Sequence, residues 1–311
     1  MAPGNRTLTL SAAEREKFKK KLLFPESGAL KVSAITNKIL CGDLFNIIDL
    51  LPFEFADLLI IDPPYNLDKN FKDIKWTKTS DDKYLRYLES WFPQLLRTLK
   101  PNGSVYICGD WKSTWCLYKI MRDHTIVRNR IIWQREKGRG AKANWKNTCE
   151  DIWFGTKSNA YYFDIDAVKQ KRRVLAPYRE NGKPKDWQET SAGNFRLTYP
   201  GNFWDDISVP YWSMPENTEH PAQKPEKLIA KLILASCPAK GHIFDPFAGS
   251  GTTAVAAKKL DRVYTGVEIN VDYCCLAEKR LLLAETKSAI QGYSNGVFWE
   301  RNTYNIQKER K

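Results

Sequence analysis

The sequence has few of the residues that hold metals or disulfides, and it lacks a long apolar run. Its 311 residues include only three histidines, and its seven cysteines are scattered without a metal-type CxxC pair. Zinc, haem and a disulfide framework are therefore not expected, and a reducing cytoplasm suits the chain best. No apolar run approaches the roughly 20 residues that cross a bilayer, and the first residues do not form the apolar segment of a signal peptide. We expect neither a membrane partner nor a metal.

What the chain has in excess is positive charge. Lysine and arginine total 49 against 36 acidic residues, which gives a net charge of +13, and 42% of the residues are hydrophobic. A packed globular core with a basic surface favours a polyanionic partner, most simply nucleic acid, through phosphate neutralisation. A merely basic enzyme without such a partner is the alternative. Eleven tryptophans are present, and exposed ones are available to stack on bases.

Residues 57–67 read DLLIIDPPYNL, an apolar run that stops at an aspartate and two prolines. Four consecutive aliphatic residues are typical of a strand buried on both faces of a parallel sheet. Because Pro63 and Pro64 lack amide protons, the strand must end at Asp62, in a stiff elbow that also carries Tyr65. In open α/β sheets, ligands bind beyond the carboxyl ends of the strands, which favours a functional site here. A plain exit from strand to turn is the alternative.

Strand and helix patterns alternate on both sides of a central irregular region. They occupy residues 37–134 and return over 216–287. This alternation predicts an α/β fold with a doubly wound, mostly parallel sheet. Residues 135–215 mix glycines, prolines, aromatics and basic clusters and are predicted to be an insertion, although 149–157 have the pattern of a sheet strand. A basic N-terminal arm and a polar C-terminal tail are predicted at residues 1–36 and 288–311.

The segment HIFDPFAGSGTTAVAAKKL, at 242–260, predicts a strand, a glycine-rich turn and a helix. Gly249 and Gly251 allow the backbone to approach a ligand, but their spacing matches neither GxGxxG nor GxxxxGK[ST], so a phosphate cradle is poorly supported. Asp245 at the strand end instead favours a cationic or hydrogen-bond-donating ligand group. The next strand ends on Glu268, where nucleoside-binding α/β folds hold ribose hydroxyls. A nucleoside with a positively charged tail, such as S-adenosylmethionine, matches this combination.

These motifs together resemble a known family, the amino-methylating DNA methyltransferases of the β arrangement. DPPY at 62–65 is similar to the catalytic motif of that group, and DPFAGSGTT at 245–253 is similar to its cofactor motif. HPAQKP at 220–225 resembles the segment that closes over the methionine end of the cofactor, and GD at 42–43 resembles the pair with the adenine-contacting acid. The resemblance covers residues 37–285.

The resemblance implies an enzyme that transfers the methyl group of S-adenosylmethionine to the 6-amino group of an adenine flipped out of double-stranded DNA. It also implies a circularly permuted, Rossmann-like methyltransferase fold, with a catalytic half at 37–134, a target-recognition insertion at 135–215 and a cofactor-binding half at 216–287. Permutation is tolerable because the catalytic and cofactor strands need only be neighbours in the sheet. Further expectations are a cognate restriction endonuclease, a monomer or homodimer, and a place at the nucleoid of a prokaryotic cytoplasm.

For the reaction, Asp62 and the carbonyl of Pro63 are predicted to accept the two protons of the target amine, which stabilises positive charge as it develops. Tyr65 is predicted to stack on the flipped base, and Pro64 completes the catalytic motif. A sulfonium methyl group needs no metal, so the enzyme contributes mainly positioning and electrostatics.

For the cofactor, Asp245 and the turn are expected at the methionine end, Glu268 at the ribose and Asp43 at the adenine amine. Lys224 is expected to meet the methionine carboxylate, with a solvated lysine at a helix start as the alternative. His220 is expected to be structural, and Asn66 is a secondary contact. The predicted cofactor-binding residues are Asp43, Asp62, Lys224, Asp245, Phe247, Ala248, Gly249, Ser250, Gly251, Thr252, Glu268 and Asn270.

Two basic clusters in the insertion are predicted to contact DNA. REKGRGAKANWK at 135–146 places its cations on a glycine-bearing loop, where they can hold phosphates or read guanine edges; a solvated hairpin is the alternative. KQKRR at 169–173 is predicted to contact phosphates only. The predicted DNA contacts are Arg135, Lys137, Arg139, Lys142, Lys146, Arg172 and Arg173.

Four other functions are alternatives to adenine methylation. Cytosine enzymes of this group more often carry serine where Asp62 stands, which favours adenine over the 4-amino group of cytosine. An RNA adenine methyltransferase stays open because positive charge does not separate the two nucleic acids, whereas a glutamine methyltransferase usually has an asparagine-first elbow placed after the cofactor motif. A DNA-binding protein with an inactive methyltransferase fold is disfavoured because both motifs are intact.

Overall fold

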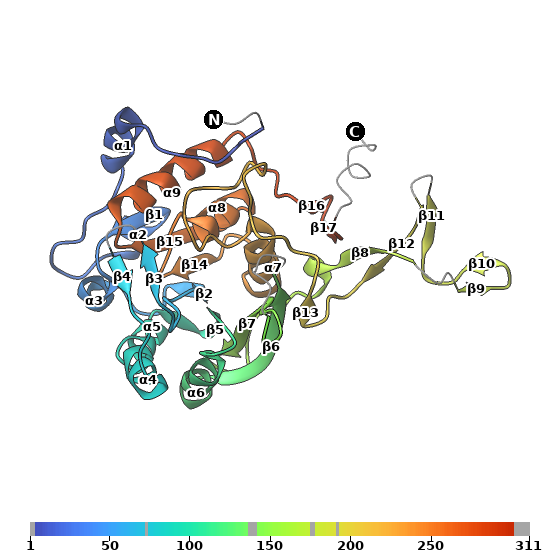
Figure 1. The fold of residues 1–311 in the computed structure, drawn as a ribbon, viewed down its shortest axis with the longest axis horizontal. Helices are drawn as coiled ribbons and strands as arrows, with labels where there is room; N and C mark the ends of the chain where they lie inside the picture. The colour runs from blue at the N-terminus through green and yellow to red at the C-terminus, as the bar shows by residue number, and fades with distance from the viewer. Residues whose placement is uncertain (1–3, 72–73, 136–141, 175–177, 191–192, 302–311) are drawn as a thin grey trace.

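The computed structural model describes residues 4–71, 74–135, 142–174, 178–190 and 193–301. Within them an eight-stranded sheet forms the centre of the molecule, with helices on both faces (Figure 1). No helix among these residues is long and apolar enough to cross a membrane. In spatial order the strands are β1 (Lys38–Cys41), β15 (Val263–Glu268), β14 (His242–Asp245), β2 (Ala56–Ile61), β5 (Leu99–Gly109), β7 (Cys149–Thr156), β6 (Ile126–Gln134) and β13 (Phe203–Trp204).

The sheet is mostly parallel, as expected. Every neighbouring pair from β1 through β15, β14 and β2 to β5 runs parallel, whereas β7 is antiparallel to both β5 and β6. β14 follows the predicted insertion in the chain, yet it lies directly beside β2, which precedes that region. The α/β fold with permuted strand order is therefore confirmed.

The apolar run of β2 is buried on both sides of the sheet. Leu58 and Ile60 belong to one apolar cluster, with α7 (Glu226–Ser236), α8 (Thr252–Lys259) and α9 (Val271–Ala284). Leu59 and Ile61 belong to a second cluster on the other face, with residues of the helices α4 (Asp81–Glu89), α5 (Phe92–Leu96) and α6 (Thr114–His124). The remaining helices of the described residues are α1 (Ala12–Lys19), α2 (Val32–Ile35), α3 (Leu44–Ile47), and the short 3-10 turns η1 (Ile48–Leu50) and η2 (Asp166–Val168).

The helical pattern over residues 81–99 forms two helices, as a proline inside it predicts. α4 ends at Glu89 and α5 begins at Phe92, so that Pro93 lies in the first turn of α5. A proline costs no helical hydrogen bond there, because the first amides of a helix have no partner within it. The fully buried ring of Trp91 occupies the junction.

The first 36 residues, predicted as a basic arm, include a helix that packs on the body. Phe18 of α1 is buried in the same apolar cluster as α9, and Lys279 Nζ of α9 lies 2.6 Å from Glu14 Oε1. Leu23 forms a parallel bridge with Leu40 of β1. Lys17 and Lys19 therefore lie on the exposed side of a packed helix.

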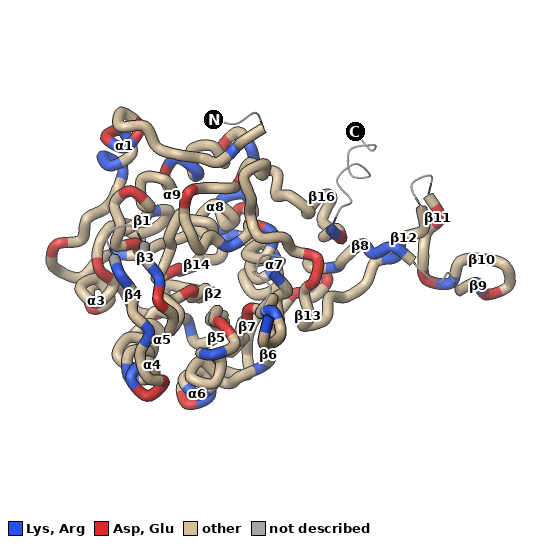
Figure 2. The backbone as a smooth tube through the Cα atoms, in the orientation of Figure 1, with Lys and Arg blue, Asp and Glu red and all other residues tan. Residues whose placement is uncertain are grey.

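The insertion contributes small sheets that extend away from the body (Figure 1). Lysines and arginines line β8 and β12, where this extension leaves the body (Figure 2). Its largest sheet has the order β11 (Gln188–Thr190), β12 (Gly193–Thr198), β8 (Gln170–Arg173), β17 (Val297–Trp299) and β16 (Tyr293–Ser294). A further pair in the insertion is β9 (Arg179–Glu180) with β10 (Lys183–Pro184), whereas β3 (Lys69–Phe71) pairs with β4 (Ile74–Trp76) before the insertion in the chain.

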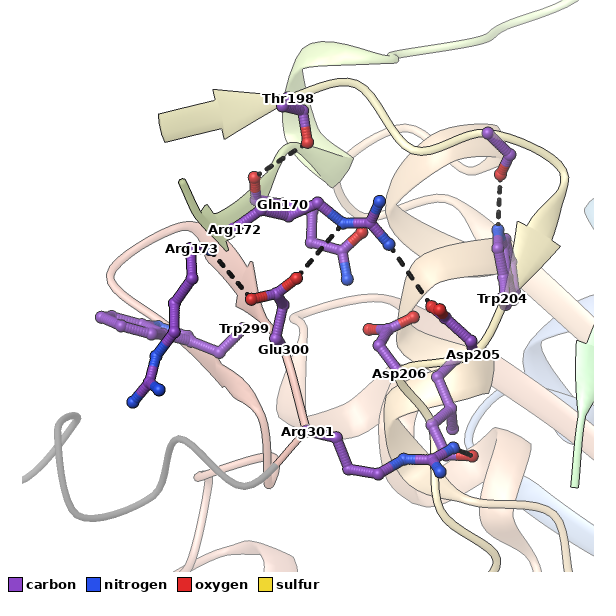
Figure 3. A network of polar contacts seen from close by, with 12 residues as sticks. Gln170, Arg172, Arg173, Thr198, Trp204, Asp205, Asp206, Trp299, Glu300 and Arg301 are labelled. Carbon is purple, nitrogen blue, oxygen red and sulfur yellow. Dashed lines mark hydrogen bonds and ion pairs between the residues drawn. The ribbon is translucent and has the colours of Figure 1, made fainter. Parts of the chain in front are cut away.

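The C-terminal tail is thus part of the same sheet as the insertion. β17 runs parallel to β8, and Phe298 is fully buried against the body. Beneath this junction, Asp206 of the insertion receives Lys231 Nζ at 3.1 Å and Lys227 Nζ at 2.6 Å, and Lys227 also donates to the carbonyl of Trp299. Figure 3 shows where Asp206 and Trp299 lie at this junction, together with Arg172 and Glu300. One buried carboxylate therefore ties insertion, tail and α7 together.

This buried cluster yields a stability prediction. Lys231 is 1% exposed, and burial lowers its pKa to about 8 despite the Asp206 carboxylate, which raises it. Replacing Asp206→Asn leaves two buried ammonium groups without a counter-ion, which is expected to cost about 3–5 kcal/mol of unfolding free energy. Chemical denaturation measures this loss.

The matched control is Asp123→Asn. Asp123 also pairs with two cations, Lys119 and Arg122, but on the exposed surface of α6. Exposed pairs contribute at most about 1 kcal/mol, so this variant should unfold nearly as the parent does. Equal losses in the two variants would contradict a special role for the buried cluster.

Candidate active site

A cavity of about 740 Å³ opens at the carboxyl edge of the central sheet. This volume lies within the range of about 300–1,000 Å³ that is typical of ligand sites. The elbow after β2, the turn after β14 and the end of β15 all contribute to its lining, as parallel neighbouring strands require. β7 is antiparallel, so its first residues reach the same edge and add Glu150.

The elbow after β2 is held in place by its own neighbours. The hydroxyl of Tyr84 donates to the carbonyl of Pro64 at 3.0 Å. The side chain of Asn66, predicted as a secondary cofactor contact, is buried and bonds both backbone groups of Thr79, at 2.8 and 3.0 Å. These contacts fix Asp62 at the edge of the cavity.

Lys224 lies directly on the carboxylate of the elbow. Its Nζ is 2.6 Å from Asp62 Oδ2, donates to the hydroxyl of Tyr65 at 3.1 Å, and lies 3.4 Å from Glu150 Oε2. Although burial lowers the pKa of Lys224, the Asp62 and Glu150 carboxylates outweigh that effect and raise it above its ordinary value. Lys224 is therefore a permanent cation in the cavity wall.

Tyr65 bridges the two carboxylates. Its hydroxyl lies 3.0 Å from Asp62 Oδ1 and 3.1 Å from Glu150 Oε2. Burial raises the pKa of Tyr65 well above its usual range, and the two acids raise it further. The phenol keeps its proton and donates it to one acid at a time.

Glu150 is a site residue that the sequence prediction missed. It is buried at the start of β7, lies beside Tyr65 and Lys224, and forms an ion pair with Arg135 at the end of β6. The signal available in the sequence was two consecutive acids, Glu150 and Asp151, at the start of an otherwise apolar strand. A buried carboxylate needs a hydrogen-bonding or oppositely charged partner, and such buried charge pairs are frequent at functional sites.

The glycine turn after β14 is organised around Glu268. One carboxylate oxygen accepts the amide of Gly249 at 2.9 Å, and the other accepts the amide of Asn270 at 2.8 Å. Gly249 and Gly251 both have positive φ, which glycine adopts without strain. A β-carbon on Gly251 would lie 2.5 Å from the side chain of Ala277, so the missing side chain admits α9 rather than a ligand.

The predicted cofactor residues divide into two groups. Asp43, Asp62, Lys224, Phe247, Gly249, Glu268 and Asn270 line the cavity, whereas Asp245, Ala248, Ser250, Gly251 and Thr252 are absent from its lining. Ser250 and Thr252 are instead bound by Arg280. Its guanidinium donates to the carbonyl of Ser250 and to the hydroxyl of Thr252, each at 2.9 Å. The ring of His220 packs edge-on against Tyr273, with ring centres 4.4 Å apart.

The predicted DNA contacts also separate. Arg135 lines the cavity, Lys142 and Lys146 are exposed, and Lys137 and Arg139 lie outside the described residues. Arg172 pairs with Asp205 at 3.3 Å and with Glu300 at 3.6 Å, which joins the insertion to the tail (Figure 3). The backbone amide of Arg173 also bonds Glu300, while its side chain points away from Asp205 (Figure 3).

Comparison with known proteins shows that the sequence is similar to DNA methylases. The family model described as DNA methylase matches residues 56–279. The chain is 33% identical over 260 residues to DNA adenine methyltransferase YhdJ of Escherichia coli (strain K12), a match that covers 81% of the chain and 84% of the relative. It is 31% identical to type II methyltransferase M.HpaI of Haemophilus parainfluenzae, over 78% of the chain and 74% of the relative.

Solved structures agree on the fold. The cytosine-N4-specific PvuII DNA methyltransferase superposes with a TM-score of 0.59 at 16% identity, and the match covers 86% of this chain and 95% of that one. The complex of M1.HpyAVI with SAM superposes with a TM-score of 0.54 at 23% identity, over 78% and 98% of the two chains.

Asp245 gives a pH prediction. Burial raises its pKa to about 7, although hydrogen bonds from Thr253 and the amide of Phe247 oppose the shift. An unfolded aspartate titrates near 3.9, so between about pH 4 and 7 the folded chain holds a proton that the unfolded chain releases, and stability falls as pH rises. Asp245→Asn cannot ionise but keeps an acceptor for Phe247. We expect thermal unfolding to show the variant more stable than the parent at pH 8, by up to about 4 kcal/mol, with the gain vanishing near pH 4. Parallel pH profiles of the two proteins would contradict the raised pKa.

Proposed function

The chain belongs to the family of DNA methylases, and we propose that within it the protein methylates the 6-amino group of an adenine flipped out of double-stranded DNA. The observation that supports this proposal most directly is the position of Asp62. Its carboxylate lies at the start of a rigid proline elbow, in the lining of a cavity that the glycine turn also lines. The relative YhdJ is named an adenine methyltransferase, and an aspartate rather than a serine at position 62 supports the same base. PvuII methyltransferase, which is cytosine-N4-specific, has the same fold, so cytosine is the second candidate.

Asp62 and the elbow would act on the target amine. The carboxylate accepts one amine proton and the carbonyl of Pro63 the other, which directs the nitrogen lone pair away from the ring and stabilises positive charge as it forms. Tyr65, locked as a neutral phenol, offers its ring to the base. Base flipping is needed because the amine cannot be approached in line within the stack.

The methyl donor that the cavity suits is S-adenosylmethionine, which supplies a methyl group on a positively charged sulfur. Glu268 is fixed at a strand end by two backbone amides, so its remaining lone pairs suit the hydroxyl donors of a ribose. Asp43 lines the same cavity at the start of α3, as an acceptor for an adenine amine. The carboxylates along this wall favour a cationic ligand, and Phe247 adds an apolar ring.

The DNA-binding surface would be formed by the insertion, except for β7, which belongs to the central sheet. The C-terminal segment would contribute to it through β17, which pairs with β8. Lys142 and Lys146 are exposed on the loop between β6 and β7, whose ends hold Arg135 and Glu150 in the cavity wall. Trp145 on the same loop is 96% exposed, as suits a ring that stacks on bases. We assign phosphate contacts to these lysines and to Arg173.

Further parts of the proposal follow the type II naming of relatives such as M.HpaI. They are a paired restriction endonuclease, a monomeric or dimeric state, and action on nucleoid DNA in a prokaryotic cytoplasm.

Nucleoside mass spectrometry of unmethylated duplex DNA, after incubation with the protein and S-adenosylmethionine, tests the reaction. Methyl on the adenine amine is the expected result. Methyl on the cytosine amine would keep the fold and transfer the assignment to the other base. The absence of methyl from both bases would contradict the proposal and move the search to RNA.

Asp62→Ala tests the elbow. Loss of the acceptor should lower kcat by at least about 10²–10³-fold, since removing one preorganised group at a developing charge has that effect. The affinity for S-adenosylhomocysteine, measured by calorimetry, should stay nearly unchanged. Asp49→Ala removes an exposed carboxylate outside the cavity and serves as the control. Near-parental turnover by Asp62→Ala would show that the elbow has been assigned wrongly.

A further inference from the structure

The reaction proposed at Asp62 does not by itself require Lys224. An amine needs only acceptors from the elbow, yet a buried ammonium lies 2.6 Å from the very carboxylate that would accept. Lys224 is also some 162 residues from Asp62 in the chain and reaches it from the segment before α7. Desolvating a cation is costly, so a lysine placed here has either a structural task or a ligand to contact.

Counting hydrogen bonds shows what is available. An ammonium has three N–H groups. Lys224 donates one to Asp62 and one to the hydroxyl of Tyr65, while Glu150 Oε2 lies 3.4 Å away, at the length of an ion pair rather than a good hydrogen bond. One donor can therefore turn to an acceptor in the cavity, which Lys224 lines. Asp62 likewise accepts from Tyr65 and Lys224 and has lone pairs left for a ligand.

The two groups side by side form an acceptor next to a donor. On adenine, the 6-amino group is a donor and the ring nitrogen N1 is an acceptor, and both are bonded to the same carbon. Cytosine presents the same order with its 4-amino group and N3. Thymine and guanine present a carbonyl oxygen next to an N–H, which would set oxygen against carboxylate and N–H against ammonium. The pair thus matches the amine and ring nitrogen of adenine and cytosine and repels the carbonyl and N–H of thymine and guanine.

We propose that Lys224 donates a hydrogen bond to the ring nitrogen beside the target amine, N1 in adenine, while Asp62 accepts from the amine itself. This assignment rests on the proposed function and adds a base-selecting residue to it. A flipped base is read along this edge, because it no longer pairs with its partner strand. The contact also covers N1, a competing ring nucleophile, so that the amine alone is left free to receive the methyl group.

The test uses the full-length protein and a duplex that carries the site mapped from its own methylation of DNA. Absence of methyladenine after incubation with the parent enzyme would overturn the proposed function, and the contact between Lys224 and N1 with it. The target adenine is replaced by 1-deazaadenine, which lacks N1, or by 7-deazaadenine, which lacks a nitrogen far from the amine. The parent should lose about 10- to 100-fold in kcat/KM on the 1-deaza target, the range for a hydrogen bond to a charged group.

Lys224→Met removes the donor and keeps the length of the side chain. Its ratio of kcat/KM between adenine and 1-deazaadenine should fall at least about 10-fold below the parent ratio, since the intrinsic reactivity of each base cancels in the comparison. Lys69→Met changes another lysine of the cavity lining and should keep the parent ratio. Lys224→Arg, which restores a donor, should recover part of the discrimination.

Several outcomes would overturn the assignment. An unchanged ratio in Lys224→Met would show that the lysine does not contact N1. An unchanged ratio together with weakened binding of S-adenosylhomocysteine would place Lys224 on the methionine carboxylate instead. Should the variant fail to fold, the parent enzyme alone decides: a 1-deaza target that is methylated as well as the 7-deaza target excludes the contact.

Discussion

The contact between Lys224 and Asp62 is the interaction on which the candidate site depends. It joins the segment before α7 to the elbow after β2, and Tyr65 and Glu150 complete the cluster around it. Lys224 and Glu150 are buried, Asp62 and Tyr65 are half-buried, and the hydroxyl of Tyr65 joins the two carboxylates. The carboxylates of Asp62 and Glu150 face two cations, Lys224 and Arg135, so the charges balance within this cluster. The permuted chain order is harmless because β14 and β2 are neighbours in the sheet.

The direction of the strands decides which residues can join this cluster. Parallel strands bring their carboxyl ends to one edge, and for that reason the elbow, the glycine turn and Glu268 meet there. β7 is reversed, so its beginning reaches the same edge, and Glu150 arrives from a strand that otherwise serves as core. The reversal is therefore part of how the site is built.

Much of the fold and part of the site were predictable from local sequence pattern. The apolar run before DPPY, the helix-breaking proline at 93 and the strand–turn–helix at 242–260 are each specified by neighbouring residues, and the structure has them in those places. Glu150 was not predictable because its role comes from contacts with residues distant in the chain. The turn sequence predicts that Gly251 contacts the ligand, whereas in the structure the absence of its side chain allows Ala277 to pack closely. The turn sequence alone does not show this contact, because Ala277 lies on another helix.

The strand β17 lies next to β8, so the sheet that we assign to target recognition is built from two distant parts of the chain. Residues Val297–Trp299 complete it, Glu300 holds Arg172 and Arg173, and Trp299 is bonded by Lys227. If relatives exchanged this sheet by recombination, the insertion and the C-terminal segment would have to be exchanged together. A chimera that receives only the insertion of a relative and retains its original C-terminal segment would pair a foreign β8 with the original β17. If this sheet reads the target, the choice of DNA sequence would depend on both segments together.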